Sequence, residues 1–473
     1  MPLPSVIGMC TQAVPLQLFP DARSIGPVSE PSFRVAVVGS GPAGFYAAAA
    51  LFASDLELEV DLIERLPTPW GLVRLGVAPD HPNIKAVSRA FEKTAANPGF
   101  RFFGNVEVGR DVTHEELAGL YDAVLYSVGA QTDRSLGIPG EELPGSWAAT
   151  EFVAWYNGHP DFQHLSFDLS GERVVVIGNG NVALDVARML ALTPEELAVT
   201  DTTDAAIDAI NGAGIREILV VGRRGPVQAA WTPVEVGELG ELEGADVLVD
   251  PADLELDRAS EAELAAAPPT VRRNVEHLRD YAGRTPGGKP RAIRLRFLSS
   301  PVAIVGEERV EGVELVRNEL VDGRAVATGE RETVACGIVF RSVGYRGVAL
   351  PGLPFDEGTG TIPNAAGRVE PGLYCAGWIK RGPSGVIGTN KKDATETVQL
   401  LLEDARAGSL PPRAGGSLEE LLAGRGVDAV LYAGWESIDM TERAAGEPHG
   451  RPRVKLATWE ELLAAAQVAK SAK

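Results

Sequence analysis

Cysteine is scarce in this chain: only Cys10, Cys336 and Cys375 occur among its 473 residues. No two of them are close enough in sequence to form a CxxC motif, which disfavours a disulfide framework, a thiolate zinc site and a built-in iron–sulfur cluster. Long apolar runs are also missing, because no stretch approaches the roughly 18 residues that a membrane-spanning helix needs. We therefore expect no metal site and no membrane span.

Positive charge is in short supply as well. The sequence has 44 Lys and Arg against 65 Asp and Glu, which gives a net charge of −21. Non-specific binding to nucleic acid needs a net basic surface, so nucleic acid is disfavoured as a partner. Hydrophobic residues make up 45% of the chain, which is typical of globular proteins. At roughly 150 residues per domain, the length predicts about three domains, or two with insertions.

Residues 1–32 carry little information. They hold six prolines, no positive charge before Arg23 and no continuous apolar core, so they do not make a good secretory signal. We expect a flexible or surface-draped extension on a cytoplasmic protein.

The ordered pattern begins with one βαβ unit. Phe33–Val38 is typical of a buried parallel strand, 45–53 of an alanine-rich helix and 58–64 of a second strand. Between the first strand and the helix lies GSGPAG, in which Gly39 allows the turn, Gly41 lets a pyrophosphate approach and Gly44 lets the helix pack closely. Glu64 ends the second strand, where a carboxylate accepts hydrogen bonds from ribose hydroxyls. This context makes a dinucleotide site the favoured interpretation over a glycine-rich turn without a ligand.

A second unit of the same kind starts at Arg173. A strand over 173–177 is followed by GNGNVA at 178–183, a helix over 184–192 and a later strand over 218–221. No acidic residue follows that last strand, and Arg223 and Arg224 stand there instead. Two guanidinium groups favour a 2′-phosphate, and hence NADP rather than NAD, although they could also be ordinary surface arginines. An insertion around 204–214 explains the long interval before them.

Two similar segments flank the second unit. Residues 123–130 and 338–345 both read as strands that end in small residues. Their placement predicts that the second domain is inserted into the first, with crossovers near Gly129 and Gly344. The expected fold is therefore α/β, with two Rossmann-like nucleotide-binding domains of three layers each.

A third candidate segment lies near the C-terminus. Residues 373–378 read as a strand and turn, and 384–388 lead into a helix that runs to about Val398. A helix N-terminus stabilises nearby negative charge, such as the charge of a reduced flavin. Trp378 is either an aromatic neighbour of that flavin or a core residue.

Taken together, these motifs resemble the adrenodoxin-reductase-type ferredoxin–NADP⁺ reductases, including their bacterial members. The matching stretches extend over most of the chain: GSGPAGFY at 39–46, GLVRLGVAPDHP at 71–82, GNVEVGRD at 104–111, NGNVALDVAR at 179–188, VGRRGP at 221–226 and GWIKRGPSGVIG at 377–388. The resemblance implies a flavoprotein that moves electrons between NADPH and a one-electron iron–sulfur ferredoxin through FAD. It places an FAD-binding domain at 33–135 and 345–473, the latter including the C-terminal tail, and an NADP-binding domain at 136–344.

The resemblance also assigns cofactor contacts. Besides Gly39, Gly41 and Gly44, the residues implied at FAD are Ala43, Glu64, Leu72, Val108, Trp378, Gly385, Val386 and Ile387. Those implied at NADP(H) are Asn179, Gly180, Asn181, Val182, Arg223, Arg224 and Glu235, with Gly385 shared. The extension before Phe33 has no counterpart in the family pattern. Some relatives carry a fused ferredoxin domain, for which this chain has too few cysteines.

His81, one of six histidines, stands in APDHP. In the family this histidine lies near the flavin, where a carboxylate from the NADP domain can approach it. Glu238 is the first candidate for that carboxylate and Asp185 a weaker one. Such a pair would orient the imidazole and tune its protonation, so His81 and Glu238 are the catalytic candidates. The alternative is a histidine with a purely structural role, since hydride transfer needs no acid or base from the protein.

A basic patch is predicted on one helix. Arg272, Arg273 and Arg279 fall at roughly helical spacing, with Lys289 and Arg291 after them. Such a face would steer an acidic ferredoxin, or it is a solvated surface with no partner.

Two other functions remain open from the sequence. A flavoprotein that reduces a disulfide would need a redox-active cysteine pair, which the sequence does not offer. A non-catalytic FAD-binding protein would have no use for the second dinucleotide motif.

Overall fold

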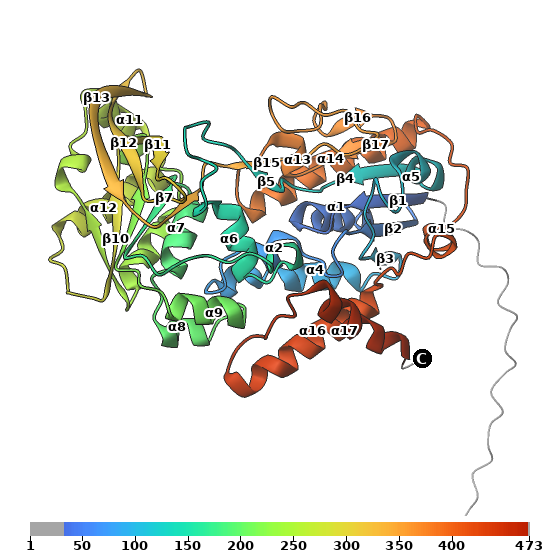
Figure 1. Cartoon of the computed structure of the whole chain (residues 1–473). Coiled ribbons are helices and arrows are strands. Elements are labelled where there is room, and N and C mark those ends of the chain that lie inside the picture. The colour runs from blue at the N-terminus through green and yellow to red at the C-terminus, as the bar shows by residue number, and fades with distance from the viewer. Residues whose placement is uncertain (1–32, 472–473) are drawn as a thin grey trace, which may run out of the picture.

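The computed structural model describes residues 33–471, which form two lobes beside each other (Figure 1). The first lobe contains a six-stranded sheet in the order β16-β17-β4-β1-β2-β3, parallel except for β16. Its strands are β1 (Phe33–Val38), β2 (Leu58–Ile63), β3 (Phe100–Phe103), β4 (Ala123–Tyr126), β16 (Arg368–Glu370) and β17 (Leu373–Cys375).

Helices cover both faces of this sheet because its strands are apolar on both sides. Val35 and Val37 of β1 face a core shared with α1 (Pro42–Phe52) and α14 (Ile387–Ala407). Ala36 and Val38 alternate to the other face and pack in a core that includes residues of α5 (His114–Leu120) and α15 (Leu418–Gly424). Alternation of side chains along a strand thus produces the three layers.

The second lobe contains an all-parallel sheet in the order β6-β14-β7-β8-β10-β9. Its strands are β6 (Ser146–Ala148), β7 (Arg173–Ile177), β8 (Glu217–Val221), β9 (Ala245–Val249), β10 (Arg291–Arg296) and β14 (Ile338–Arg341). One face packs against α6 (Ala149–Tyr156), α7 (Asn181–Met189), α10 (Pro233–Glu238) and α12 (Pro269–Gly283).

The other face of this second sheet is covered by strands rather than helices. An antiparallel sheet of β11 (Ser299–Val305), β12 (Gly312–Val321) and β13 (Arg324–Ala335) lies there. Val313 and Leu315 of β12 pack in one core with Val175 and Ile177 of β7. The three layers expected from the sequence are present, but the third layer is a sheet.

Two chain connections join the lobes and run side by side. The outgoing connection contains β5 (Thr132–Asp133), and the returning one contains β15 (Tyr345–Arg346), which pairs with it antiparallel. Gly129 and Gly344 precede these strands with φ values of 74° and 111°, which favour glycine. The predicted insertion of the second domain into the first is therefore confirmed. We propose residues 135 and 344, beside these connections, as the domain limits.

The remaining helices occupy the loops and the tail. They are α2 (Leu72–Leu75), α3 (Pro82–Lys85), α4 (Ser88–Ala95), α8 (Pro194–Ala198), α9 (Asp204–Asn211), α11 (Arg258–Ala266), α13 (Trp378–Arg381), α16 (Tyr432–Gly446) and α17 (Trp459–Ser471). The 3₁₀ turns are η1 (Pro160–Phe162), η2 (Pro226–Gln228), η3 (Leu239–Glu241), η4 (Pro251–Leu254) and η5 (Glu447–His449). Within residues 33–471, no helix has the length and apolar character to cross a bilayer. The predicted extension over 1–32, with Cys10, lies outside the described residues.

Candidate functional site

The loop after β1 has the close contacts that the glycine pattern predicts. Gly39 has φ 100°, and a Cβ there would lie 2.6 Å from the Ser127 carbonyl oxygen. A Cβ on Gly44 would lie 2.1 Å from the Gly39 carbonyl oxygen, so only glycine lets α1 start this close to the strand. A Cβ on Gly41, in contrast, would meet no described atom within 4 Å. The open side of the loop is thus at Gly41, where a dinucleotide phosphate fits.

Glu64 is held against this loop. One of its carboxylate oxygens accepts hydrogen bonds from the Ser40 backbone N–H at 3.0 Å and the Ser40 hydroxyl at 2.6 Å. The other accepts from the Leu66 N–H at 3.1 Å. The carboxylate therefore stands at the end of β2 beside the loop, in the position that suits ribose binding.

Other residues implied at FAD gather around the same loop. A Cβ on Gly71, next to Leu72, would lie 3.0 Å from Gly41 Cα, and one on Gly377, next to Trp378, would lie 2.7 Å from Ala43 Cβ. The Leu72 side chain is 38% exposed beside that loop.

Val108 and the start of α14 complete the predicted FAD set. Val108 is buried in the same core as Val38, the last residue of β1. Gly385, Val386 and Ile387 lie where α14 begins, with Gly385 and Val386 exposed to solvent.

The loop after β7 repeats the geometry. Gly178 has φ 137°, and a Cβ there would lie 2.1 Å from the Ser342 carbonyl oxygen, whereas one on Gly180 would meet no described atom within 4 Å. The Asn181 side-chain oxygen accepts a hydrogen bond from the Thr232 N–H at 2.9 Å, and Val182 follows in the first turn of α7. The buried amide nitrogen of Asn179 has no partner among the described residues, which leaves it available to a ligand.

Arg223 and Arg224 follow β8 directly. Arg223 is exposed and Arg224 is half-buried. Among residues 33–471, no acidic side chain forms an ion pair with either guanidinium. Two unpaired guanidinium groups at the end of this strand are suited to a 2′-phosphate.

A cluster of charged residues joins the two domains between these loops. His81 Nε2 lies 2.8 Å from a Glu238 carboxylate oxygen and 3.7 Å from one of Glu235. At the other side of the ring, Arg188 Nη2 lies 3.4 Å from His81 Nδ1. The contact between His81 and Glu238 is thus present, and Asp185, the weaker candidate, has no direct hydrogen bond to the ring within the described residues. The Asp185 carboxylate instead accepts a hydrogen bond from Arg188.

Arg188, which the sequence reasoning did not single out, is the centre of this cluster. Its side chain is 3% exposed and lies near four carboxylates. The contacts are Asp80 at 2.6 Å, Asp185 at 2.9 Å, Glu235 at 3.1 Å and Glu238 at 3.6 Å. The signal that could have found it is its position at the end of NGNVALDVAR, three residues after Asp185 and thus on the same face of α7.

Burial, with a smaller effect of nearby carboxylates, changes the pKa of Asp185. Burial raises the pKa of Asp185 to about 7, with Glu235 and Asp80 acting in the same direction and Arg188 and His81 against it. The fully buried hydroxyl of Tyr156 has no hydrogen-bond partner among the described residues, and burial together with Asp185 raises its pKa well above the ordinary value. A protonated Asp185 thus reduces the charge that this buried site must carry.

His81, Glu235 and Glu238 also have the ligand types of a metal site, with ligand atoms within 4.8 Å of one another. Arg188 already lies against both carboxylates, at 3.1 and 3.6 Å, and compensates their charge. A cation added there would be repelled by the guanidinium, so we infer no metal at this position.

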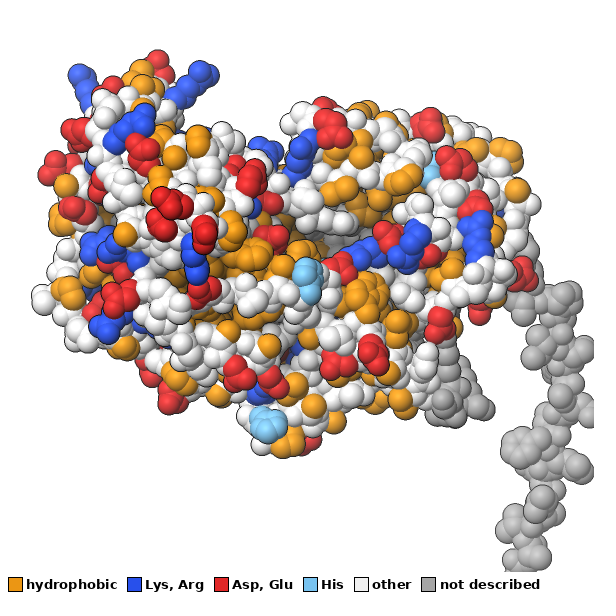
Figure 2. Space-filling model, viewed as in Figure 1, with side chains coloured by type: hydrophobic (Ala, Val, Ile, Leu, Met, Phe, Trp, Pro, Cys, Tyr) orange, Lys and Arg blue, Asp and Glu red, His pale blue; other side chains and the backbone are white. Residues whose placement is uncertain are grey.

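Aromatic side chains pack together where β15 returns to the first lobe and α13 begins. The rings of Tyr345 and Trp378 lie 5.1 Å apart, and Trp378 Nε1–H donates a hydrogen bond to the Ser384 carbonyl oxygen at 3.2 Å. Figure 2 shows a hollow between the two lobes with hydrophobic side chains along it.

The predicted basic patch is only partly available. Arg272, Arg273 and Arg279 are exposed on α12. Arg291, however, donates to the carbonyl oxygens of Leu190 and Leu192 at 2.7 and 3.0 Å, so its guanidinium is used inside the domain. The three arginines of α12 remain as the candidate docking patch because they are exposed, although Arg272 also donates a hydrogen bond to the Ala267 carbonyl oxygen before the helix.

The described cysteines do not form a redox pair. Cys336 and Cys375 are buried free thiols in separate hydrophobic cores, one in each lobe. Burial raises the pKa of each thiol to about 12, so neither is a reactive thiolate.

Comparison with known proteins decides between the remaining alternatives. The profile of the pyridine nucleotide-disulphide oxidoreductase family matches residues 33–219. NADPH-ferredoxin reductase FprA of Mycobacterium tuberculosis is 54% identical over 450 residues, which cover 91% of this chain and 98% of that protein. The chain belongs to the NADPH-ferredoxin reductase family. It is an oxidoreductase that binds FAD and NADP(H), as the motifs predict.

Two further relatives support this membership. Human mitochondrial NADPH:adrenodoxin oxidoreductase is 45% identical over 451 residues, covering 91% of each chain. The solved structure of Mycobacterium tuberculosis FprA in complex with NADPH matches with a TM-score of 0.86 and 54% identity, over 92% of this chain and 99% of that one. The resemblance to the adrenodoxin-reductase type is therefore confirmed along almost the full length of each relative.

Proposed function

We propose that this protein is a ferredoxin–NADP⁺ reductase that passes electrons between NADPH and an iron–sulfur ferredoxin through bound FAD. The observation that carries the proposal is the presence, in one chain, of two dinucleotide loops with different neighbouring residues. One is accompanied by Glu64, which suits an unphosphorylated ribose, and the other by the unpaired Arg223 and Arg224, which suit a 2′-phosphate. His81 and Glu238 meet between them.

The first domain fits FAD by the shape of its loop. The open position at Gly41 and the fixed carboxylate of Glu64 would hold the pyrophosphate and the ribose, while Ala43, Leu72, Val108 and Trp378 surround the rest. When bound, the flavin supplies the exchange between a two-electron hydride donor and a one-electron acceptor.

The second domain fits NADP(H). Residues 179–182 would approach the pyrophosphate, and the buried unpartnered amide of Asn179 is a free donor there. Glu235, in contact with Arg188 at 3.1 Å, would border the nicotinamide end of the site. Reaction then depends on how closely the two domains bring the two rings together.

We propose His81 and Glu238 as the catalytic pair beside the flavin. Glu238 fixes the ring of His81 from the second domain, and Arg188 lies against its other nitrogen. The pair would hold or release a proton at His81 Nε2 as the charge on the flavin changes.

The partner is an acidic ferredoxin that docks on Arg272, Arg273 and Arg279. These side chains are exposed on one helix of a protein whose net charge is −21, so they form a local basic face against a negative field. Local charge of the opposite sign steers an acidic partner to one face. The cytoplasm is the compartment that we propose for both proteins.

The experiment is NADPH-dependent reduction of cytochrome c with and without added ferredoxin. We expect ferredoxin to be required, and ferricyanide to be reduced without it. Charge reversal at all three arginines of α12 to Glu should slow the ferredoxin-dependent rate about tenfold or more at low salt and leave ferricyanide reduction unchanged. As a control, reversal of the exposed Arg406 on the first domain should affect neither reaction. Loss of both activities in the α12 variant would place docking elsewhere.

Reduction of a disulfide is the less favoured alternative. The described cysteines, Cys336 and Cys375, are buried in different cores and have raised pKa values. A disulfide substrate would therefore find no thiolate among residues 33–471 to attack it.

A further inference from the structure

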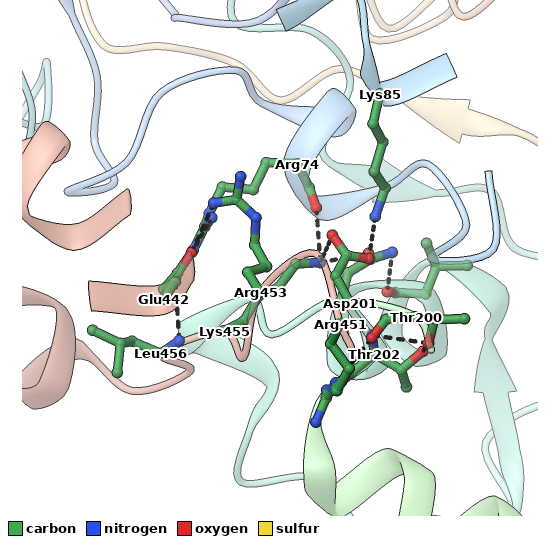
Figure 3. Close-up of polar contacts among 12 residues, drawn as sticks. Arg74, Lys85, Thr200, Asp201, Thr202, Glu442, Arg451, Arg453, Lys455 and Leu456 are labelled. Atoms are coloured by element: carbon green, nitrogen blue, oxygen red, sulfur yellow. Dashed lines mark hydrogen bonds and ion pairs between the residues drawn. The ribbon is translucent and has the colours of Figure 1, made fainter. Parts of the chain in front are cut away.

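Three separate segments of the chain meet at a polar junction between the two domains (Figure 3). Lys85 at the end of α3 donates to one carboxylate oxygen of Asp201 at 2.6 Å. Lys455, in the segment between η5 and α17, lies 3.3 Å from the other oxygen. Asp201 stands between α8 and α9, in the second domain, so its carboxylate joins the second domain to the first and to the C-terminal tail.

The tail contacts both domains through the same ammonium group. Lys455 Nζ donates to the Arg74 carbonyl oxygen of the first domain at 3.2 Å and to the Asn157 side-chain oxygen of the second at 3.0 Å. Nearby, Arg451 donates to the Thr200 carbonyl oxygen at 3.0 Å. One short stretch of the tail therefore spans the boundary between the domains.

The tail is itself anchored on the first domain. Glu442 of α16 is fully buried and accepts two hydrogen bonds from Arg74, at 2.5 and 2.8 Å, and one from Arg453 at 3.0 Å. The ring of Trp435, also on α16, packs edge-on against Trp70 at 4.8 Å. Because α16 is fixed there, the segment between α16 and α17 forms a strap. It starts on the first domain at α16 and contacts Asp201 of the second domain through Lys455.

Two of the three charged residues at the junction are buried, and Lys85 is half-buried. Asp201 is 5% and Lys455 6% exposed. Burial alone would raise the pKa of Asp201, but Lys455 and Lys85 outweigh it and hold the pKa well below the ordinary value. Burial lowers the pKa of both lysines. The carboxylate is thus charged at neutral pH, and it offsets part of the repulsion between the two lysine side chains.

A buried ion pair of this kind is a poor source of net stability, because desolvation offsets the attraction. It is a good source of fixed geometry, because removal of one partner leaves the others without compensation. The junction lies at the end of α3, so it fixes the position of this helix relative to the second domain. The helix α3 starts directly after His81 and ends with Lys85. Over about 6 Å, a single short helix joins the contact of His81 with Glu238 at one end to the junction at the other.

We propose that Asp201 is a positioning residue: through Lys85 and Lys455 it sets the angle between the two domains, and with it the contact of Glu238 with His81. The segment from His81 to Lys85 is then held by the second domain at both ends. The strap also reaches α2 through Arg74, two residues after Leu72, a residue implied at the flavin. This inference rests on the proposed function, because the angle matters only if two bound rings must meet between the domains.

The test compares Asp201→Asn with a matched control, Asp404→Asn. Asp404 is also buried, at 8% exposure, and is also paired, with Arg368 at 2.7 Å and Tyr374 at 2.6 Å. All three lie in the first domain, so the control removes the charge of a buried, paired carboxylate without touching the domain boundary; its partner Arg368 is 34% exposed. Both variants are made in the full chain with FAD bound.

The first measurement is the distance between the domains, which does not depend on activity. Spin labels are placed at Glu92→Cys on α4 and Glu261→Cys on α11, both exposed, with Cys10→Ser to remove the thiol outside the described residues. We expect Asp201→Asn to broaden or shift the distance distribution, and Asp404→Asn to leave it unchanged. An unchanged distribution in Asp201→Asn overturns the proposal.

The second measurement separates positioning from stability. Stopped-flow reduction of the flavin by NADPH should be about tenfold to a hundredfold slower in Asp201→Asn, with little change in KM for NADPH, because a displacement of about 1 Å suffices for such a loss. Asp201→Glu should recover part of the rate. An equal loss in Asp404→Asn would reduce the junction to a folding role and overturn the proposal.

Two further variants cover the case in which Asp201→Asn does not fold. Lys85→Met and Lys455→Met each leave Asp201 with one ammonium partner and should change the distance distribution in the same direction. If both leave the distance and the rate unchanged, the proposal is wrong. If wild-type flavin is not reduced by NADPH, the proposed function fails, while the spin-label comparison still decides whether Asp201 fixes the domains.

Discussion

His81 and Glu238 come from different domains and are 157 residues apart in the chain, yet His81 Nε2 lies 2.8 Å from the Glu238 carboxylate. His81 belongs to the segment that leads into α3, and Glu238 ends α10. The contact exists only while the two domains keep their present angle. The contact is therefore a candidate for a catalytic role, and its presence depends on how the two domains are positioned.

Replacement of His81 by Gln removes the ring but keeps a polar side chain of similar length. We expect flavin reduction by NADPH to slow about tenfold, because one hydrogen bond to a charged group is lost beside the reacting centre. Glu238→Gln should have a similar effect, and the double variant should lose less than the product of the two. Anaerobic stopped-flow absorbance measures this, with the exposed His164→Gln as the control. A wild-type rate in His81→Gln would leave His81 a structural role only.

The choice between NADPH and NADH should depend on Arg223 and Arg224. Removal of each guanidinium costs the charge-assisted contacts to the 2′-phosphate, so the Ala variants should raise KM for NADPH about tenfold or more each. NADH, which lacks that phosphate, should be used as before. Arg216→Ala, just before the other end of the same strand, is the matched control. Equal losses with both nucleotides would contradict the assignment.

The dependence of stability on pH should show the raised pKa of Asp185. Its pKa is about 7 in the folded protein against an ordinary value of 3.8, so between these values the folded state holds a proton that the unfolded state has released. Stability therefore falls as pH rises through this range. Asp185→Asn should remove that decline and be more stable than the wild type at pH 8 by about 1 to 4 kcal/mol.

Denaturant unfolding at a series of pH values measures this difference. The two proteins should be about equally stable near pH 4, where Asp185 is largely protonated in the folded wild type. A wild-type excess of stability at pH 8 would show instead that the charged carboxylate is favoured beside Arg188.

Two glycines of the first loop should respond differently to alanine. Gly44→Ala places a Cβ 2.1 Å from the Gly39 carbonyl oxygen, so the apoprotein itself should be destabilised, by several kcal/mol. Gly41→Ala places a Cβ in open space at φ −73°, so the apoprotein should keep its Tm but fail to retain FAD. Thermal unfolding of the apoproteins and flavin absorbance after gel filtration measure the two effects. FAD retained at wild-type level in Gly41→Ala would mean that the phosphates lie elsewhere.

The parallel strands were predictable because they are short, apolar runs that end in glycine turns. The limits predicted for the strands at 33–38 and 173–177 coincide with β1 and β7. The sheet of β11–β13 was not foreseen, because β13 is exposed along almost its whole length and has no apolar periodicity. The apolar contacts of this sheet with the rest of the domain come mainly from β11 and β12.

The buried charges were the least predictable part of the site. Arg188, Asp201 and Lys455 are charged residues of types that normally lie on the surface, and nothing in their immediate sequence shows that they are buried. Their partners come from distant parts of the chain: Lys85 is 116 residues from Asp201, and Arg74 is 381 from Lys455. Pairings at such separations follow from the arrangement of the domains, which local patterns do not encode. The glycine loops, in contrast, carry their function in adjacent residues.

Electron transfer from NADPH to a flavin held in the same chain is the step on which the proposed function depends most. Anaerobic addition of NADPH to the purified protein, followed by the visible absorbance of the flavin, tests this step directly. We predict that the yellow absorbance bleaches at close to one NADPH per flavin and returns when oxidised ferredoxin is added. A protein that binds FAD but does not bleach, or that cannot be loaded with flavin at all, would contradict the account.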